Sequence, residues 1–236
     1  MEKPNRPSSL HKAALPLIRV SGVKRNPDKV RSLLRSLARN TATVVEISAL
    51  ENDIRHRDNA DVSRPTIYEY LDVFHRLMIV EDQPAWSTQL RSSATLRKSP
   101  KRHFADVSLA VAALGAGSEA LLNDLKFTGF LFESLVIHDL RVYAQANDDE
   151  VYHYTDSNGL EVDAIVQKHS GEFCGFEIKL GVGQNDDAAR NLLRFASGLG
   201  EHSASQLRSL NVITGKGVSY TRPDGVNVIS LASLGY

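Results

Sequence analysis

The fold is decided by two stretches, LEVDAIV at residues 160–166 and FEIKL at residues 176–180. Side chains alternate between the two faces of a β-strand. We therefore expect Asp163 to point away from the apolar face of the first stretch, and Glu177 and Lys179 to share the polar face of the second. Two otherwise apolar strands each present charge on one side.

The charged faces of the two strands define a candidate metal site. If they coincide, Asp163 and Glu177 pair their carboxylates, and Mg²⁺ prefers oxygen ligands of this kind. Lys179 is expected at the edge of this site. The remaining residues of the first strand divide by the same alternation, with Leu160, Val162 and Ala164 on one face and Glu161 on the face of Asp163.

The elements around the two strands follow from apolar periodicity and turn signals. One long helix is predicted at 127–143, and the turns Asn158-Gly159 and His169-Ser170-Gly171 join three strands into a meander. The strands are predicted at 151–155, 160–167 and 173–180, followed by a helix at 186–200 and by strands at 210–214 and 226–231.

Glu133 adds a third acid from the long helix. Its neighbours on the same helix face include Phe130, Val136 and Ile137, and an ionised carboxylate among apolar groups is unfavourable unless it is paired or bound to a metal. The alternative is a solvent-accessible glutamate on a mostly buried helix. We expect Glu133 to point inward toward a partner.

The first half of the chain favours a different module. Residues 1–27 are rich in proline and are expected to be an irregular tail, and residues 28–117 suggest a winged helix-turn-helix. Its third helix begins after Ser63, a suitable N-cap, and would be the recognition helix. The other expected elements are helices starting at Asp28 and at 47–54, a strand at 78–80, a loop at 81–84 and a helix at 106–114.

Charge is distributed unequally between the halves. Residues 1–110 contain 19 Lys and Arg against 12 Asp and Glu, whereas residues 111–236 contain 9 against 16. A basic first half suits contact with DNA phosphates, although attraction between the halves explains the same asymmetry. The candidate nucleic-acid contacts are Arg64, Arg97, Lys98, Lys101 and Arg102, and a solvated basic loop is the alternative for the last four.

Composition excludes several classes of protein. The chain has 236 residues, 42% of them hydrophobic and 24% charged, which suits two globular modules. Its single cysteine, Cys174, excludes an internal disulfide framework and a multi-cysteine zinc site. Neither a secretory signal nor a run of 18 apolar residues is present, so we expect a cytoplasmic protein without membrane contact.

Five motifs together carry a resemblance. The chain resembles the C-terminal half of a large family of prokaryotic AAA+-type ATPases, whose C-terminal domain of unknown function is similar to PD-(D/E)xK nucleases. The similarity runs from about Arg19 to the C-terminus. The motifs, in chain order, are RSLARN at 35–40, SPKRHF at 99–104, FLFE at 130–133, EVD at 161–163 and EIK at 177–179.

The resemblance implies a fold and a chemistry. It implies an α/β (α+β) chain in which a winged helix precedes a restriction-endonuclease-like αβββαβ core at 118–236. By analogy, Asp163, Glu177 and Glu133 hold Mg²⁺ or Mn²⁺, and Lys179 steers or activates the attacking water. The phosphate-binding loop of the ATPase module has no counterpart here, so we expect no nucleotide and no ATPase activity from this chain alone.

Three functional hypotheses remain open at this level. The first is a Mg²⁺-dependent nuclease acting on DNA. The second is a non-catalytic module that recognises nucleic acid or a partner and is coupled to an ATPase, for example a separate chain acting in trans. The chain itself would then be a truncated gene product, an excised domain or a free-standing remnant. The third makes Glu177 and Lys179 part of an ion-pair network that holds helix to sheet.

Overall fold

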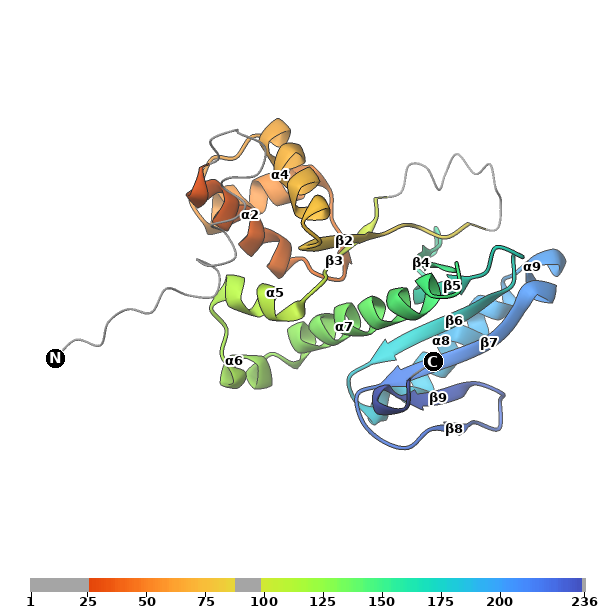
Figure 1. Cartoon of the computed structure of the whole chain (residues 1–236). Helices are drawn as coiled ribbons and strands as arrows, with labels where there is room; N and C mark the ends of the chain where they lie inside the picture. Colours follow the sequence, from red (N-terminus) through yellow and green to blue (C-terminus); the bar gives the residue numbers. More distant parts are fainter. Residues whose placement is uncertain (1–25, 88–98, 235–236) are drawn as a thin grey trace. The chain divides into compact units, whose positions relative to one another are not determined.

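A computed structural model describes residues 26–87 and 99–234 (Figure 1). The chain forms two compact units, and each is described by itself. Of the described residues, unit 1 comprises 26–82 and 102–125, and unit 2 comprises 83–87, 99–101 and 126–234. Helices and strands are mixed in the chain, which confirms the α/β class at this coarse level.

Unit 1 contains helices and a small three-stranded sheet. The strands pair in the order β1-β3-β2. The last residue of β2 and the first residue of β3 belong to unit 2. In chain order the elements are α2 (Pro27–Arg39), β1 (Thr43–Val44), α3 (Ile47–Arg57), α4 (Arg64–Arg76), β2 (Val80–Gln83), β3 (Lys101–Phe104), α5 (Val107–Leu114) and α6 (Ser118–Asn123).

The start of α2 and its ion pairs show why unit 1 folds locally as it does. Asn26 caps the helix by accepting the Asp28 N–H at 2.9 Å, and a proline follows at the first helical position. Farther along, Arg35 Nε lies 2.9 Å from Asp58 Oδ2. Arg39 contacts the same carboxylate at 3.3 Å, so α2 is tied to the residue that follows α3.

Two details of unit 1 differ from the sequence expectation. The strand expected at 78–80 is instead Val80–Gln83, because Met78 has a left-handed backbone (φ 52°) that ends the preceding helical segment. Most of the loop expected at 81–84 is therefore strand. Helix α6 was not expected from the sequence.

Unit 2 is built around a six-stranded sheet of order β4-β5-β6-β7-β9-β8. The β4, β5 and β6 strands form the antiparallel meander, whereas β7 pairs parallel to both β6 and β9. The elements are α7 (Leu125–Gln145), β4 (Glu150–Thr155), β5 (Glu161–Gln167), β6 (Phe173–Lys179), η2 (Val182–Gln184), α8 (Asn185–Ser197), α9 (Glu201–Gln206), β7 (Leu207–Thr214), β8 (Tyr220–Thr221), β9 (Asn227–Ser230) and η3 (Leu231–Ser233).

A helix covers each face of this sheet (Figure 1). On one face α7 packs Val136 and Ile137 against Ile178 and Ile213. On the other face α8 packs its apolar side against a second cluster that contains Leu192. The helix expected at 186–200 ends earlier than predicted, at Ser197.

A β-bulge in the β4–β5 pair changes the expected faces of β5. Tyr152 pairs with Ile165 and Tyr154 pairs with Val162, so two residues of β5, Asp163 and Ala164, lie opposite one residue of β4. As a result Val162 and Ile165 join the cluster under α8, while Ala164 joins the cluster under α7. The expectation that Val162 and Ala164 share a face is wrong.

The segment after β2 is an integral part of unit 2. The His153 N–H of β4 donates to Pro84 O at 2.9 Å, and the Trp86 N–H donates back to His153 O at 2.6 Å, so the chain adds a short parallel bridge beside β4. The Trp86 ring is buried against Phe173, with ring centroids 4.7 Å apart. Its Nε1 donates to Gln167 Oε1 at 3.1 Å.

The lengths and hydropathies of the helices bear on membrane insertion. Across 26–87 and 99–234, none combines the length and the apolar character that a transmembrane segment requires.

Candidate functional site

Asp163 lies where β5 and β6 separate. Ladder pairing between these strands ends at Ala164 and Phe176. Beyond that pair, the Asp163 carboxylate takes the place of a backbone partner, because its Oδ2 accepts the Ile178 N–H at 2.8 Å. Gln83 supports the same residue from outside the core strands, since its Nε2 donates to Asp163 O at 3.0 Å. The backbone and the side chain of Asp163 are therefore both held in place.

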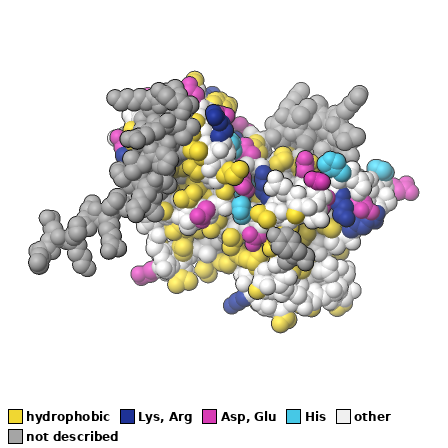
Figure 2. All heavy atoms as spheres, in the orientation of Figure 1, with side chains coloured by type: hydrophobic (Ala, Val, Ile, Leu, Met, Phe, Trp, Pro, Cys, Tyr) yellow, Lys and Arg dark blue, Asp and Glu magenta, His cyan; other side chains and the backbone are white. Residues whose placement is uncertain are grey.

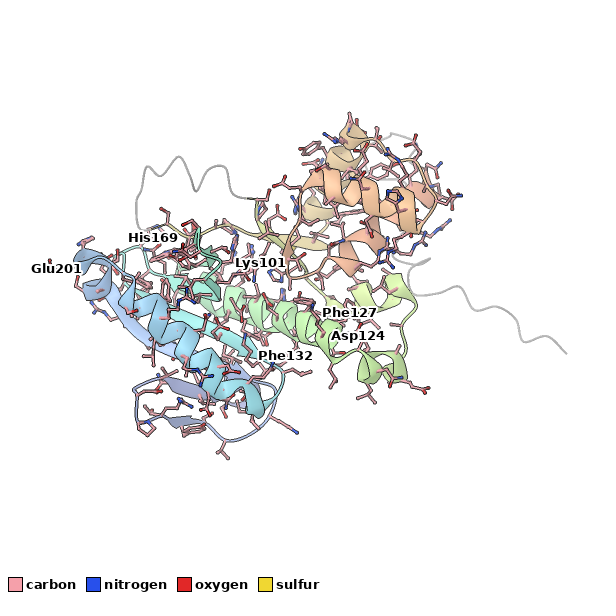
Figure 3. The ribbon with its side chains drawn as sticks, turned by 180° about the vertical axis from the view of Figure 1, so that it is seen from behind. Lys101, Asp124, Phe127, Phe132, His169 and Glu201 are labelled. Atoms are coloured by element: carbon pink, nitrogen blue, oxygen red, sulfur yellow. The ribbon has the colours of Figure 1, made fainter. Side chains whose placement is uncertain are left out.

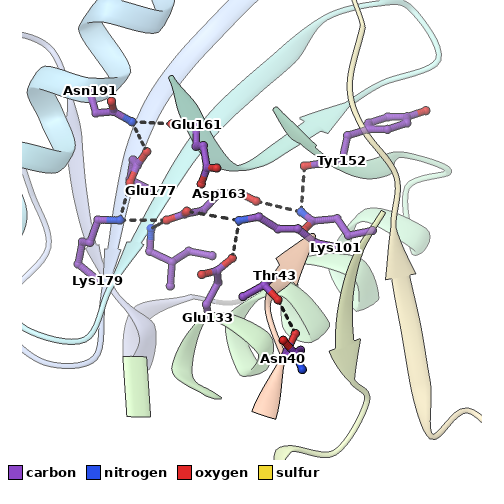
Figure 4. Close-up of polar contacts among 12 residues, drawn as sticks. Asn40, Thr43, Lys101, Glu133, Tyr152, Glu161, Asp163, Glu177, Lys179 and Asn191 are labelled. Carbon is purple, nitrogen blue, oxygen red and sulfur yellow. Dashed lines mark hydrogen bonds and ion pairs between the residues drawn. The ribbon is translucent and has the colours of Figure 1, made fainter. Parts of the chain in front are cut away.

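Glu177 and Lys179 share one face of β6, as the alternation predicted, and both turn toward Asp163. Lys179 Nζ lies 3.1 Å from Asp163 Oδ2 and 2.5 Å from Glu177 Oε2. On the side of α8, Asn191 Nδ2 donates to Glu177 Oε1 at 2.6 Å and to Glu161 O at 2.6 Å (Figure 4). Asn191 thus connects α8 to both central strands, a role that was not expected from the sequence.

Glu133 points inward from α7 and meets a lysine from β3. The glutamate is 7% exposed, so the solvent-accessible alternative is wrong. Lys101 Nζ lies 2.9 Å from Glu133 Oε1 and 3.9 Å from Asp163 Oδ1. Lys101 reaches from β3 toward α7 within unit 2 (Figure 3). The four predicted residues and Lys101 therefore form one buried cluster of three carboxylates and two ammonium groups.

Burial and crowding raise the pKa of two of these acids. Burial raises the pKa of Glu133 to about 8, and the nearby Asp163 carboxylate adds to the effect. The pKa of Glu177 rises to about 7 for the same two reasons. In both cases the lysines oppose the rise without cancelling it, so Glu133 and Glu177 keep their protons to a higher pH than an ordinary glutamate does.

The other members of the cluster keep their ordinary charges. Burial alone would raise the pKa of Asp163, but the two ammonium groups and the Ile178 N–H hold that pKa below its usual value. Burial likewise favours neutral lysine, yet the surrounding carboxylates raise the pKa of both Lys179 and Lys101. Asp163 is therefore the anionic centre of the cluster, and both lysines carry positive charge.

Two residues expected to contact DNA phosphates are placed elsewhere. Lys101 has a side chain only 6% exposed, and it is committed to the acidic cluster. Arg102 points into unit 1, where its Nη1 donates to Val45 O at 2.7 Å and its Nε lies 3.4 Å from Asp82. The expectation of a solvated basic surface is wrong for these two, because both guanidinium and ammonium groups have internal acceptors.

The other expected DNA contacts stay predictions. Arg97 and Lys98 lie outside the described residues. Arg64 is exposed on α4, but its Nε donates to Glu51 Oε2 at 2.8 Å. On the face shown in Figure 2, acidic and basic side chains are interspersed. Sequence alone gave no sign that Arg64 has an acidic neighbour 13 positions earlier in the chain.

The three carboxylates are chemically suitable ligands for a metal ion, but in this structure they pair with the two lysines. Oxygen donors such as those of Glu133, Asp163 and Glu177 are the ligands that Mg²⁺ and Mn²⁺ prefer. In the arrangement of the described residues, however, no three His, Cys, Asp or Glu side chains are grouped closely enough to share an ion. The ammonium groups of Lys101 and Lys179 lie between the carboxylates instead.

Comparisons with known proteins give two family matches. A domain of unknown function, DUF8612, matches residues 18–120, and another, DUF4143, matches residues 128–234. The second match supports an ATPase-associated family, in agreement with the resemblance described above. No curated protein matches the chain.

One solved structure is weakly similar to this chain. It is a refined half-complex from the tetradecameric assembly of Thermococcus gammatolerans McrB AAA+ hexamers with bound McrC. The alignment has 9% sequence identity, covers 86% of this chain and 70% of that chain, and has a TM-score of 0.31. At that TM-score the likeness carries no argument about fold or function.

Proposed function

We propose that unit 2 is a PD-(D/E)xK nuclease-type domain that hydrolyses phosphodiester bonds in DNA with the help of Mg²⁺ or Mn²⁺. The observation that carries the proposal is the convergence of Glu133, Asp163, Glu177 and Lys179 in one buried cluster. These four residues come from three separate elements. A structural ion pair needs only two residues. The meeting of all four where β5 and β6 separate therefore favours a functional site.

The order of the elements supports the proposal. Helix α7, the meander β4-β5-β6, helix α8 and strand β7 follow one another in the αβββαβ order that the resemblance implied. In unit 1 three helices and a three-stranded sheet follow the order of a winged helix, which we propose as the DNA-contacting part. An ATPase of the resembling family is the proposed partner.

Each residue of the cluster has a proposed role. Asp163 and Glu177, with Glu133 beside them, would hold the divalent cation, which supplies an activated water and stabilises the charge that develops on the phosphate. Lys179 lies within contact of both Asp163 and Glu177, so it is placed to orient a water or a phosphate oxygen at their edge. Asn191 keeps the Glu177 carboxylate directed toward Asp163.

A specific observation favours a second candidate, a non-catalytic recognition module. Both ammonium groups already pair with the three carboxylates, as they would in an ion-pair network that only stabilises the fold. The outward side of α4, the expected recognition helix, also carries the exposed acids Glu69 and Asp72, which do not favour a DNA backbone. This candidate retains the fold and binds a partner without cutting DNA.

A cleavage assay separates the two candidates. Supercoiled plasmid, single-stranded DNA and branched DNA are incubated with Mg²⁺ or Mn²⁺ and with wild type, Asp163→Asn or Lys179→Met protein. Lys168→Met is the matched control, because Lys168 is exposed at the β5–β6 turn, the opposite end of these strands from Asp163. A nuclease predicts metal-dependent cutting that falls by about 100-fold or more in the two site variants and is unchanged in Lys168→Met.

The opposite outcome is equally clear. If wild-type protein binds the DNA in the same samples and cuts none of the substrates with either metal, the nuclease proposal is wrong. If cutting persists in Asp163→Asn, it arises from a contaminant or from another site. Retained binding without cutting supports the recognition module.

A further inference from the structure

We propose that Lys101 is an internal counter-cation of the acidic cluster, which competes with a divalent metal ion for the carboxylates of Asp163 and Glu133. This inference rests on the proposed function, because it concerns the same site. It adds a residue from outside the αβββαβ core, and a form of control over metal loading that the four expected residues do not provide.

The two oxygens of Asp163 have different neighbours. Oδ2 already accepts the Ile178 N–H at 2.8 Å and faces Lys179 Nζ at 3.1 Å. Oδ1 is therefore the oxygen left for a further cation. Lys101 Nζ lies 3.9 Å from this oxygen. A metal ion bound to Oδ1 would have to approach from the side on which this ammonium lies.

Glu133 leads to the same position. Its Oε1 accepts a hydrogen bond from Lys101 Nζ at 2.9 Å. A metal ion that bridges Glu133 and Asp163 would need the space between these two carboxylates, and that space is where the Lys101 ammonium stands. The Lys101 ammonium and a metal ion in the same buried space would repel each other strongly. Lys101 must therefore move away for the metal ion to bind.

Lys101 and Lys179 differ in how they are attached. Lys179 follows Glu177 by two residues on β6, so it belongs to the same rigid strand as its acidic partner. Lys101 is the first residue of β3 and lies outside the αβββαβ core. Gln83, the last residue of β2, also contacts Asp163, because its Nε2 donates to Asp163 O. Lys101 is therefore a cation that the core itself does not supply.

Metal binding by the purified full chain tests the competition without relying on cleavage. Mn²⁺ is titrated into each protein by isothermal calorimetry, and free Mn²⁺ is followed in parallel by electron paramagnetic resonance. The proteins are wild type, Lys101→Met, Lys101→Arg, Lys168→Met and Asp163→Asn. Lys101→Met removes the cation and keeps the length of the side chain, Lys101→Arg keeps the charge, and Lys168→Met removes one exposed positive charge from the same unit.

The competition predicts a definite order of affinities. Lys101→Met should bind Mn²⁺ at least about tenfold more tightly than wild type, equivalent to about 1.4 kcal/mol. Lys101→Arg and Lys168→Met should stay within about twofold of wild type, and Asp163→Asn should lose the site. Because Lys101→Met leaves buried carboxylates without their partner, Mn²⁺ should also raise its melting temperature more than that of wild type.

Two results would overturn the inference, and they are distinguishable. If wild type and Lys101→Met bind Mn²⁺ equally and Asp163→Asn does not bind, the metal site exists and Lys101 does not compete for it. If none of the proteins binds Mn²⁺ and no melting temperature responds to it, both the inference and the metal-dependent function are wrong. A Lys101→Met protein too unstable for calorimetry is still tested by its melting temperature with and without Mn²⁺, where an unchanged value counts against the inference.

Discussion

Trp86 should contribute to the stability of unit 2 although it lies before the core in the sequence. It is 4% exposed, and its ring contacts Phe173, Phe195 and Tyr154 at centroid distances of 4.7, 5.9 and 6.0 Å. Burying a tryptophan removes roughly 150–250 Å² from water, which at ~25 cal/mol per Å² corresponds to about 4–6 kcal/mol. We therefore expect Trp86→Ala to lower the free energy of unfolding of unit 2 by about 3–5 kcal/mol.

The loss can be measured and located. Urea unfolding followed by far-ultraviolet circular dichroism gives the free energy, since the variant lacks the only tryptophan. Hydrogen exchange of peptides from β5 and β6 shows whether the change falls in unit 2. Trp86→Phe should lose about 1–2 kcal/mol, because the ring remains and the Nε1 donor to Gln167 is lost. Tyr68→Ala, at an exposed site in unit 1, should change stability by less than about 0.5 kcal/mol.

A small effect would refute this reasoning. If Trp86→Ala costs less than about 1 kcal/mol, or if exchange increases only in unit 1, then the segment that contains Trp86 is not part of the folded core of unit 2.

The remaining predictions concern the acidic cluster and α2. The pKa values of Glu133 and Glu177 are raised in the folded state, from 4.5 to about 8 and about 7, so the folded protein binds more protons than the unfolded chain across this pH range. The free energy of unfolding should therefore fall as pH rises from about 5 to 8 in metal-free buffer. Glu133→Gln should flatten that slope in urea titrations. Asn191→Leu should lower the melting temperature through a loss of about 1–3 kcal/mol, since Glu177 Oε1 and Glu161 O lose their donor, whereas an unchanged melting temperature would mean that water replaces the amide. Asp58→Ala should destabilise unit 1 by up to about 3 kcal/mol in the same urea assay, because Arg35 and Arg39 both lose an acceptor; a loss no larger than that of an exposed control, Asp61→Ala, would contradict this.

Local patterns predicted most elements of unit 2, although not α9 or β8, and four of the five residues of the cluster. The meander was visible because Asn158-Gly159 marks a tight hairpin, and Gly159 indeed has φ 78°. Glu133 could be recognised as inward-pointing because its helical neighbours are apolar, and it is buried. Such signals depend only on residues close in the chain, so they survive without knowledge of the tertiary fold.

Features that depend on pairing across the chain could not be predicted. The bulge at Asp163 and Ala164 arises from the register with β4, and an alternating pattern in β5 alone contains no sign of it. Lys101 looked like a surface cation because its neighbours in the sequence are basic. Its true partner, Glu133, lies 32 positions later, and only the folded chain brings the two together.

The parallel pairing of β7 has a consequence for the chain during its synthesis. The acidic residues and both lysines of the cluster are all complete once β6 has been made, but the free edge of β6 finds its partner only when Leu207–Thr214 follows α8 and α9. A parallel pair needs such a crossover, whereas the meander forms between neighbours in the chain. During synthesis the edge of β6 is therefore exposed until Leu207–Thr214 covers it, and an exposed strand edge favours association with other chains.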